Sequence, residues 1–329
     1  LQIGIGEMGD AICYALLLRH QQNDVWQQAL RDIGTERFAA IVEALGGREP
    51  FADGLFGCTE MFVDQMLDLH RAGVLSRRVY DSLPLSRLIA SGHLGERFDA
   101  RILEDLIHVG VGPQLSQTEF SSLQHFGVFR QDCSYEQGRI RSSDGESLSA
   151  DLGDPAARFA LAQRCLGREL HNGHVLHAGF FVGPRGFYAA LCSMNEEQRA
   201  LFDMRGVGYI NQLYGDDAAL RVLQRPAARF VNTTMMVTLY GAAVSDGLDD
   251  GRVVSGVGGQ YNFVAMAHAL PGARSVLCVR ATRRSGGRTA SNIVASYGHT
   301  TIPRHLRDIV VTEYGIADVR GRTDAQIVG

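Results

Sequence analysis

The sequence predicts an α/β fold in which an open, mainly parallel sheet is flanked by helices. Short apolar, β-rich runs alternate along the chain with stretches of helical periodicity, which is the pattern of βαβ units. Glycines follow several of these runs, where a strand would turn into a helix. The chain has 329 residues, of which 45% are hydrophobic, so it can bury the core of one large domain or two small ones.

Apolar alternation and helical spacing predict the individual elements in turn. The predicted strands are residues 1–5, 175–181, 228–231, 252–254, 275–279, 292–294 and 309–311. The predicted helices are residues 10–19, 24–45, 62–72, 155–166, 184–191, 195–202, 218–223 and 261–269. Ligands of such sheets bind at the carboxyl ends of the strands, so the residues that follow a strand are the first candidates for a site.

Charge and cysteine usage exclude several classes of protein. The formal net charge is −4, which argues against a broad nucleic-acid-binding surface. Six scattered cysteines form no C-x-x-C pair, so neither a structural zinc site nor a disulfide framework is expected, and a reducing cytoplasm suits them. The longest apolar run, residues 11–18, is too short to span a membrane, and no membrane partner is expected.

A glycine-rich turn is the strongest local feature. Val253 and Val254 lead into Gly256, Gly258 and Gly259, and a predicted helix follows. Glycine lets the backbone approach a ligand closely and leaves N–H groups free to donate. Such turns are common in α/β proteins, so the turn alone does not identify a ligand.

Longer blocks of sequence resemble a known family. GVGGQYNF (256–263), SVLCVRAT (275–282), SNIV (291–294) and DIVVTEYGIADVRG (308–321) resemble, in this order, the C-terminal domain of the acetyl-CoA hydrolase/transferase family. GCTEMFVD (57–64) is similar to the family's G-x-x-T/S-E-M-x-x-D segment, and AGFFVG (178–183), VGYINQLYG (207–215) and ARFVNTTM (228–235) also match. The resemblance covers about two thirds of the chain and implies a sheet of the class I CoA-transferase type.

The resemblance also predicts how the chain is organised. Residues 1–329 would form the C-terminal catalytic domain, and the N-terminal partner domain that is normal in the family would be absent from this chain. Residues 21–56, an amphipathic helical stretch closed by Gly46 and Gly47, and the polar residues 134–153, an expected loop or hairpin, would be insertions that cover the site or bind a partner. A homo-oligomer, a dimer, is expected.

The family's chemistry places the catalytic residues. The resemblance assigns the nucleophile to Glu60, which would attack an acyl-CoA thioester and pass through an anhydride to a glutamyl-CoA thioester. Gly258 and Gly259 would supply N–H donors to the oxyanions. Coenzyme A is then a substrate and product, with no permanently bound cofactor, and the partners are acyl-CoA and small carboxylic acids. Water in place of the acid would make the protein a hydrolase.

Further residues are expected around the substrate. Asn232 and Glu313 match pocket residues of the family, although Asn232 could equally tie down a loop and Glu313 could pair with Arg320 or Arg322. Gly256, Gln260, Phe263 and Met266 are expected along the CoA channel, by their position after the turn. Four arginines could form a patch for the CoA phosphates or an ordinary solvated surface: Arg280, Arg283, Arg284 and Arg288. Where relatives have an acidic residue after the Asn, this chain has Thr238, which leaves substrate specificity open.

Other patterns support weaker alternatives. His171, His174 and His177 form H-x-x-H-x-x-H, but strand alternation would send His174 and His177 to opposite faces, so no metal site is expected. The leading G-I-G-x-x-G resembles a dinucleotide fingerprint but lacks the acidic residue about twenty positions on. Cys58 is expected to be a packing residue. A non-catalytic CoA-binding regulatory or scaffold domain remains the alternative to an enzyme.

Overall fold

A mainly parallel sheet forms the centre of the molecule. The computed structural model describes residues 1–94 and 97–328. Among them the central sheet has five strands, in the order β1 (Gln2–Ile3), β8 (Arg229–Thr233), β11 (Arg274–Cys278), β15 (Ile309–Thr312) and β16 (Gly315–Asp318). The first four strands are parallel and β16 returns as an antiparallel hairpin. The predicted α/β class with an open, mainly parallel sheet is confirmed.

A smaller parallel sheet lies beside the first. It consists of β2 (Gly57–Phe62), β6 (Leu176–Phe181) and β7 (Phe202–Met204). The backbone N–H of Cys58 donates to the carbonyl of Leu1 at 2.9 Å, which joins β2 to the edge of the central sheet. β2 is not among the predicted strands, because Thr59 and Glu60 interrupt the apolar pattern that identifies a buried strand.

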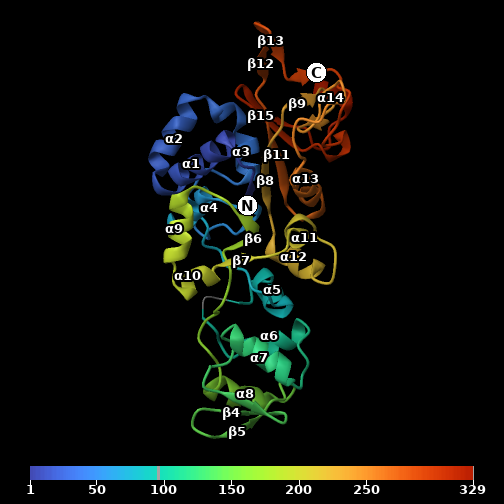
Figure 1. The fold of residues 1–329 in the computed structure, drawn as a ribbon. Helices are drawn as coiled ribbons and strands as arrows, with labels where there is room; N and C mark the ends of the chain where they lie inside the picture. Colours follow the sequence, from blue (N-terminus) through green and yellow to red (C-terminus); the bar gives the residue numbers. More distant parts are fainter. Residues whose placement is uncertain (95–96, 329) are drawn as a thin grey trace.

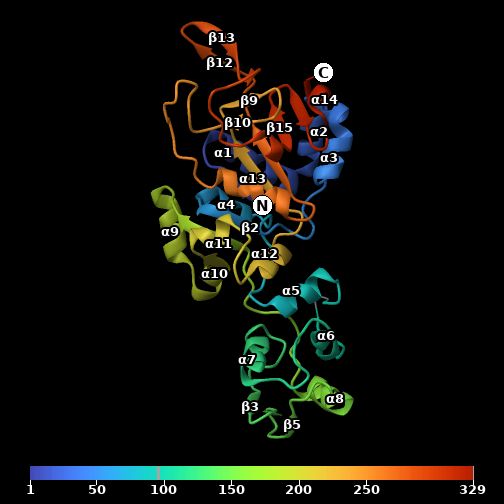
Figure 2. The same ribbon diagram turned by 90° about the vertical axis from the view of Figure 1, so that its right-hand side faces the viewer.

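Helices cover both sides of these sheets (Figures 1 and 2). α1 (Glu7–Gln21), α4 (Asp64–Arg71), α9 (Arg185–Ser193) and α10 (Glu196–Ala200) lie on one side, where Met66 and Phe187 share a core with residues of β2 and β6. α11 (Val207–Asn211), α12 (Ala218–Gln224) and α13 (Gln260–Ala269) lie on the other. There the ring of Phe263 stacks on that of Phe230 with centroids 5.6 Å apart.

Two sequence predictions about local structure are wrong. Residues 24–45 do not form one helix: Gly34, in a left-handed conformation with φ of 68°, separates α2 (Asn23–Asp32) from η1 (Thr35–Phe38) and α3 (Ala39–Leu45). Residues 252–254 do not form a strand, and only an isolated bridge joins Val253 to Gly247.

The remaining elements lie at the carboxyl-terminal end of the chain and around the central sheet. They are β9 (Met236–Thr238), β10 (Ala243–Val244), β14 (Ile293–Val294), η2 (Arg304–Leu306) and α14 (Asp324–Val328). β12 (Thr282–Ser285) and β13 (Arg288–Ser291) form an antiparallel hairpin that projects from the body of the molecule in Figure 1. No helix in the part of the chain that the structure describes is long and apolar enough to cross a bilayer.

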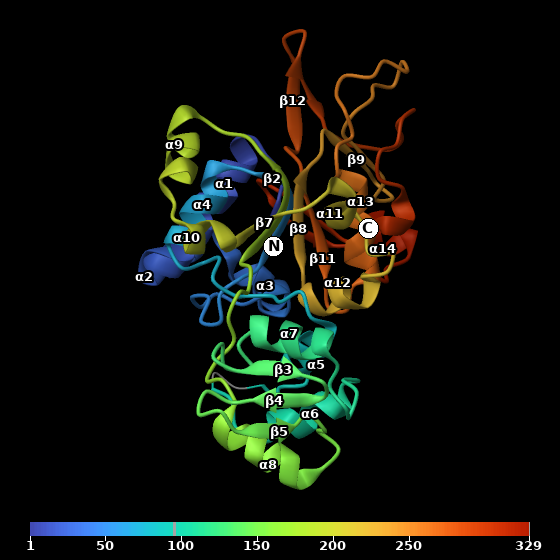
Figure 3. The same cartoon turned by 60° about the horizontal axis from the view of Figure 1, so that its bottom comes forward.

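A separate lobe projects from the opposite end (Figures 1 and 3). Within residues 83–166, here called the lobe, lie α5 (Leu83–Ala90), α6 (Ile102–His108), α7 (Gln117–His125), α8 (Pro155–Arg164) and the antiparallel strands β3 (Ser134–Glu136), β4 (Arg139–Arg141) and β5 (Ser147–Ser149). Residues 134–153 are therefore part of a larger unit, in which Ile140 and Leu148 alternate with exposed neighbours and reach a core of the lobe's own.

Two chain segments, here called the neck, connect the lobe to the sheets. Residues 79–82 lead out and residues 172–175 lead back. Val79 and His174 hold them together, since each backbone N–H donates to the other residue's carbonyl at 2.9 Å. The chain thus enters and leaves the lobe at the same point, and the lobe is inserted in the sequence between α4 and β6.

Removing one aromatic ring from the core of the lobe tests whether that core supports the lobe. Phe129 is fully buried and its ring centroid lies 5.1 Å from that of Phe120. We expect Phe129→Ala to lower the free energy of unfolding by about 3–5 kcal/mol, because it leaves a cavity in a packed interior. Denaturant titration measures the change. Phe159→Ala, on α8 of the same lobe but 64% exposed, is the control, and equal losses in the two variants would contradict this description of the core.

Candidate active site

Glu60 lies in the middle of a strand that is paired in register with β6. Thr59 pairs with Ala178 and Met61 with Phe180, so Gly179 is the neighbour of Glu60 across the sheet. A Cβ on Gly179 would lie 2.9 Å from the carbonyl oxygen of Glu60 and 3.0 Å from Val207 Cγ2. The small residue therefore lets α11 approach the strand beside Glu60.

The carboxylate of Glu60 lies directly against the glycine-rich turn. A Cβ added to Gly259 would lie 2.5 Å from Glu60 Oε2, 2.8 Å from Phe263 Cε2 and 3.1 Å from Asn211 Nδ2. Distances below 3.0 Å are not found around real Cβ atoms, so any larger residue here would force Glu60 or Phe263 to shift. The structure thus brings together Glu60 and Gly259, which lie far apart in the sequence.

The turn itself forms the beginning of α13. Gly258 has a φ of +57°, in the left-handed region, and Gly259 is the N-cap residue of the helix. The backbone N–H groups of Gly259, Gln260 and Tyr261 have no acceptor among the described residues. These free donors and the helix dipole place partial positive charge beside Glu60, where an anion or a developing oxyanion would be stabilised.

Asn211, at the end of α11, is a site residue that the sequence analysis missed. Its Nδ2 lies near Gly259, and its Oδ1 is buried without a hydrogen-bond partner in the described part of the chain. A buried acceptor without a hydrogen bond costs about 1–3 kcal/mol of stability. A hydrogen-bond donor on a bound substrate would remove this cost. The block that contains Asn211 matched the family, but nothing in the sequence separates this amide from its polar neighbour Gln212.

The other expected polar residues make contacts within the protein. Asn232, which is buried in β8, exchanges two side-chain hydrogen bonds with Gln2 of β1, at 3.2 and 3.1 Å. Gln260 donates from Nε2 to the carbonyl of Thr233 at 3.2 Å. Both amides therefore tie the carboxyl end of β8 to its neighbours, Asn232 to β1 and Gln260 to the glycine turn.

Glu313 lies in the exposed turn between β15 and β16. Its Oε2 accepts a hydrogen bond from the backbone N–H of Ala281 at 2.9 Å, and this bond holds the pKa of the carboxyl below its ordinary value. Arg320 pairs with Asp318 and Asp308, and Arg322 donates to the carbonyl of Asp318. The alternative of an ion pair between Glu313 and either arginine is therefore wrong in the described contacts.

Phe263 and Met266 are packed in the interior. Phe263 is 2% exposed and stacks on Phe230, and Met266 is 3% exposed with its sulfur 3.4 Å from a guanidinium nitrogen of Arg225. Cys58 belongs to the same core. The place of Phe263 and Met266 along a CoA channel stays a prediction, because both side chains are occupied by packing here.

A cavity of about 980 Å³ opens at the carboxyl ends of the central strands. Glu7 after β1, Thr233 at the end of β8, and Arg280 and Arg283 after β11 contribute to its lining. Glu60 is not among the described lining residues, but Gln260 contacts Thr233, so the cavity adjoins the glycine turn. Gly256 leaves its surroundings open, since no described heavy atom lies within 4 Å of a Cβ placed there.

The prediction that His174 and His177 lie on opposite faces of a strand is wrong. His174 and His177 are not separated on opposite faces: their ring centroids are 5.7 Å apart. His174 precedes β6, which begins at Leu176, so strand alternation does not apply to the pair. Burial lowers the pKa of His177 to about 3, which keeps its imidazole neutral.

Part of the chain is similar to a known family. Residues 183–328, somewhat less than half of the chain, match the model of the acetyl-CoA hydrolase/transferase C-terminal domain. The predicted resemblance to this family is therefore confirmed over these residues, and the distant relatives of the chain are CoA-transferases.

Particular relatives agree with this class. The chain is 30% identical over 162 residues to a succinyl-CoA:cyclohexane-1-carboxylate CoA transferase from Geobacter metallireducens. The aligned region covers 48% of this chain and 34% of the relative. The chain is 25% identical over 157 residues to a 4-hydroxybutyrate coenzyme A transferase from Clostridium kluyveri, covering 47% and 34%. The matches thus span about a third of the length of these curated relatives.

Solved structures share the fold. A point mutant of RipA superposes with a TM-score of 0.50 at 18% identity, over 99% of this chain and 44% of that chain. At this level of identity the similarity shows the fold alone. RipA from Yersinia pestis itself gives 0.49 over the same shares of the two chains.

Proposed function

We propose that the protein transfers CoA between acyl-CoA and a small carboxylic acid, or hydrolyses acyl-CoA, through a glutamyl-CoA thioester on Glu60. One observation carries the proposal: Glu60 Oε2 lies against Gly259 at the start of α13, beside backbone N–H groups without a partner in the described chain. The match to the acetyl-CoA hydrolase/transferase C-terminal domain and the names of the curated relatives support it.

The chemistry proceeds in two displacements. Glu60 Oε2 attacks the thioester carbonyl, the C–S bond breaks, and CoA leaves as the thiolate with an acyl-glutamyl anhydride on the protein. The thiolate then attacks the carbonyl carbon of Glu60, the acyl carboxylate leaves, and a glutamyl-CoA thioester remains. A second carboxylate reverses these steps and carries CoA away as a new thioester, whereas water would release free CoA.

Each displacement passes through a tetrahedral oxyanion. Preorganised N–H donors stabilise such a charge by about 3–4 kcal/mol each. The free N–H groups at Gly259 and Gln260 are the nearest candidates, and the helix dipole adds to their effect. Asn211 Nδ2 is a third donor on the same side of Glu60.

The adjoining cavity suits the non-reacting part of CoA. Arg280 and Arg283 supply cationic groups that could contact phosphate oxygens, and Thr233 joins this region to the turn through Gln260. Binding energy from this arm would orient the thioester against Glu60. The relatives' substrates, named as 4-hydroxybutyrate and cyclohexane-1-carboxylate, lead us to propose a small carboxylic acid as acceptor.

Covalent trapping tests the proposal. Acyl-CoA followed by borohydride should reduce the thioester and change the intact mass of the protein, and peptide mapping should place the change at Glu60. An unchanged mass after turnover would refute the glutamyl-CoA intermediate. CoA binding measured by calorimetry without transfer or hydrolysis in the same preparation would instead favour the non-catalytic CoA-binding alternative.

Removing the amide of Asn211 tests its part in the site. We expect Asn211→Ala to lower kcat/KM by about 10–100-fold, since one donor of the oxyanion environment is lost. Gln212→Ala, at the adjacent position, is the matched control in the same acyl-CoA assay. Equal activities in the two variants would remove Asn211 from the proposed site.

A further inference from the structure

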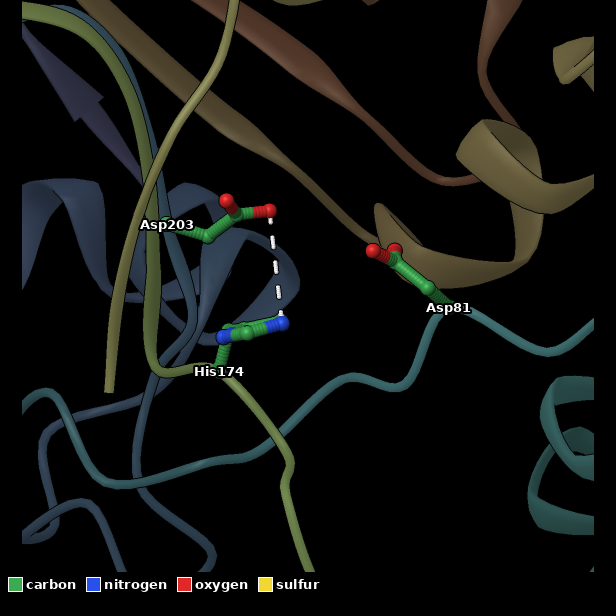
Figure 4. A group of neighbouring side chains, drawn as sticks. All are labelled: Asp81, His174 and Asp203. Atoms are coloured by element: carbon green, nitrogen blue, oxygen red, sulfur yellow. Dashed lines mark ion pairs between the residues drawn. The ribbon is translucent and has the colours of Figure 1, made fainter. Parts of the chain in front are cut away.

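Another cluster of ligand-type side chains lies at the neck of the lobe (Figure 4). Asp81 is on the outgoing segment, His174 is on the returning segment, and Asp203 belongs to β7. One carboxylate oxygen of each aspartate and one ring nitrogen of His174 all lie within 4.8 Å of one another. Three segments distant in sequence therefore direct two carboxylates and an imidazole at one point.

The orientation of His174 is that of a metal ligand. Its Nδ1 lies 2.8 Å from the carbonyl of Ala200, which can only accept, so Nδ1 carries the proton. In the neutral form of the ring, Nε2 then carries the lone pair, 4.0 Å from Asp203 Oδ2. A backbone carbonyl that holds one ring nitrogen while the other faces the ion is the usual arrangement around ligating histidines.

His177 is an independent indication of a missing partner. Its side chain is 0% exposed, and neither ring nitrogen has a hydrogen-bond partner in the described part of the chain. Its Nε2 lies 3.7 Å from Asp203 Oδ2, which is too far for a hydrogen bond. His177 is not one of the three residues whose ligand atoms converge, so its unpaired ring lies beside the cluster, next to Asp203.

Arg205 is the cation that contacts this cluster in the structure. Its guanidinium pairs with both Asp81 and Asp203 and lies 4.9 Å from the ring centre of Tyr209. The Arg205 side chain is 31% exposed, so it has room to move toward solvent. Two carboxylates thus face one guanidinium at the neck.

We propose that the neck is a zinc site, with His174, Asp203 and Asp81 as ligands and Arg205 as the internal cation that zinc displaces. Nitrogen and carboxylate donors in this number suit Zn²⁺ better than Mg²⁺ or Ca²⁺, which favour oxygen ligands. Bound zinc would join the outgoing and returning segments of the neck to β7 and so hold the lobe against the sheets. The proposal is independent of the chemistry of Glu60.

Zinc titration of the whole, chelator-treated protein tests the site. We expect calorimetry with ZnCl₂ to show one equivalent bound and the thermal unfolding midpoint to rise. His174→Ala and Asp203→Asn should each weaken zinc binding at least about 10-fold. His171→Ala, which removes the exposed first histidine of H-x-x-H-x-x-H, should bind zinc as the unaltered protein does.

Arg205→Gln separates a metal site from a simple ion-pair network. It removes the competing cation, so we expect zinc to bind at least as tightly as before. An absence of binding in both the unaltered protein and Arg205→Gln would overturn the proposal, as would equal weakening by His171→Ala and His174→Ala. Circular dichroism of His174→Gln and of the unaltered protein shows whether the variant keeps its fold. If it is folded, a loss of zinc binding reflects the lost ligand. Zinc binding retained in folded His174→Gln would also overturn the proposal.

Discussion

Glu60→Gln should abolish turnover while leaving the fold intact. The amide has nearly the shape of the carboxylate and can keep its place against Gly259, but it cannot attack a thioester. We expect kcat to fall on the order of 10³-fold or more, as for the loss of other covalent nucleophiles. A CoA-release assay on the purified protein measures the loss, and borohydride trapping should no longer modify the protein.

The control for this prediction is another glutamate of the same chain. Glu197→Gln, on the exposed face of α10, should keep the activity of the unaltered protein. Near-normal turnover in Glu60→Gln, with an unfolding midpoint equal to that of the Glu197 variant, would show that the carboxylate is not the nucleophile. The position of Glu60 at the turn would then reflect packing alone.

A single methyl group at the turn should disable the same site. Gly259→Ala places a Cβ 2.5 Å from Glu60 Oε2 and 2.8 Å from the ring of Phe263, which is packed in the interior. We expect the carboxylate to be pushed from its position and kcat to fall roughly 10²-fold or more, as misplacement by about 1 Å does elsewhere. Overpacking should also cost about 1–3 kcal/mol of stability.

Gly186→Ala provides the comparison, because no described atom lies within 4 Å of the Cβ that it adds. It lies within α9, where alanine favours the helix, so stability should be unchanged or slightly higher. Activity and denaturant midpoints of the two variants are compared side by side. If Gly259→Ala matches Gly186→Ala in both, the close contact between the turn and Glu60 has no functional importance.

The family resemblance predicted the two halves of the candidate site but not their surroundings. GCTEMFVD and GVGGQYNF pointed to Glu60 and Gly259 because a family resemblance assigns residues one by one. The strand that holds Glu60 was missed, since polar residues at a site break the apolar alternation from which strands are predicted. Asn211 was missed for a related reason: an amide at a helix end has no distinguishing pattern until its unpaired oxygen is seen.

The lobe and the histidines show a second limit. Residues 134–153 looked like an isolated polar loop, but Ile140 and Leu148 belong to a core that also includes residues from α6 to α8. The position of His174 just before β6 placed it near His177, contrary to the expected alternation. The hairpin expected at residues 134–153 is present, but its place in a larger core and the position of His174 were not predicted, because local periodicity does not describe contacts between distant segments.

Strand–helix alternation and glycine turns predicted an α/β protein, and the resemblance of short motifs to a known family predicted the relationship to CoA-transferases, because such patterns depend only on neighbouring residues. Packing alone decided that Glu60 faces Gly259, that a lobe with its own core stands on a narrow neck, and that two histidines meet Asp203. Those contacts join residues far apart in the sequence, and the energies that form them arise from close packing and burial in three dimensions.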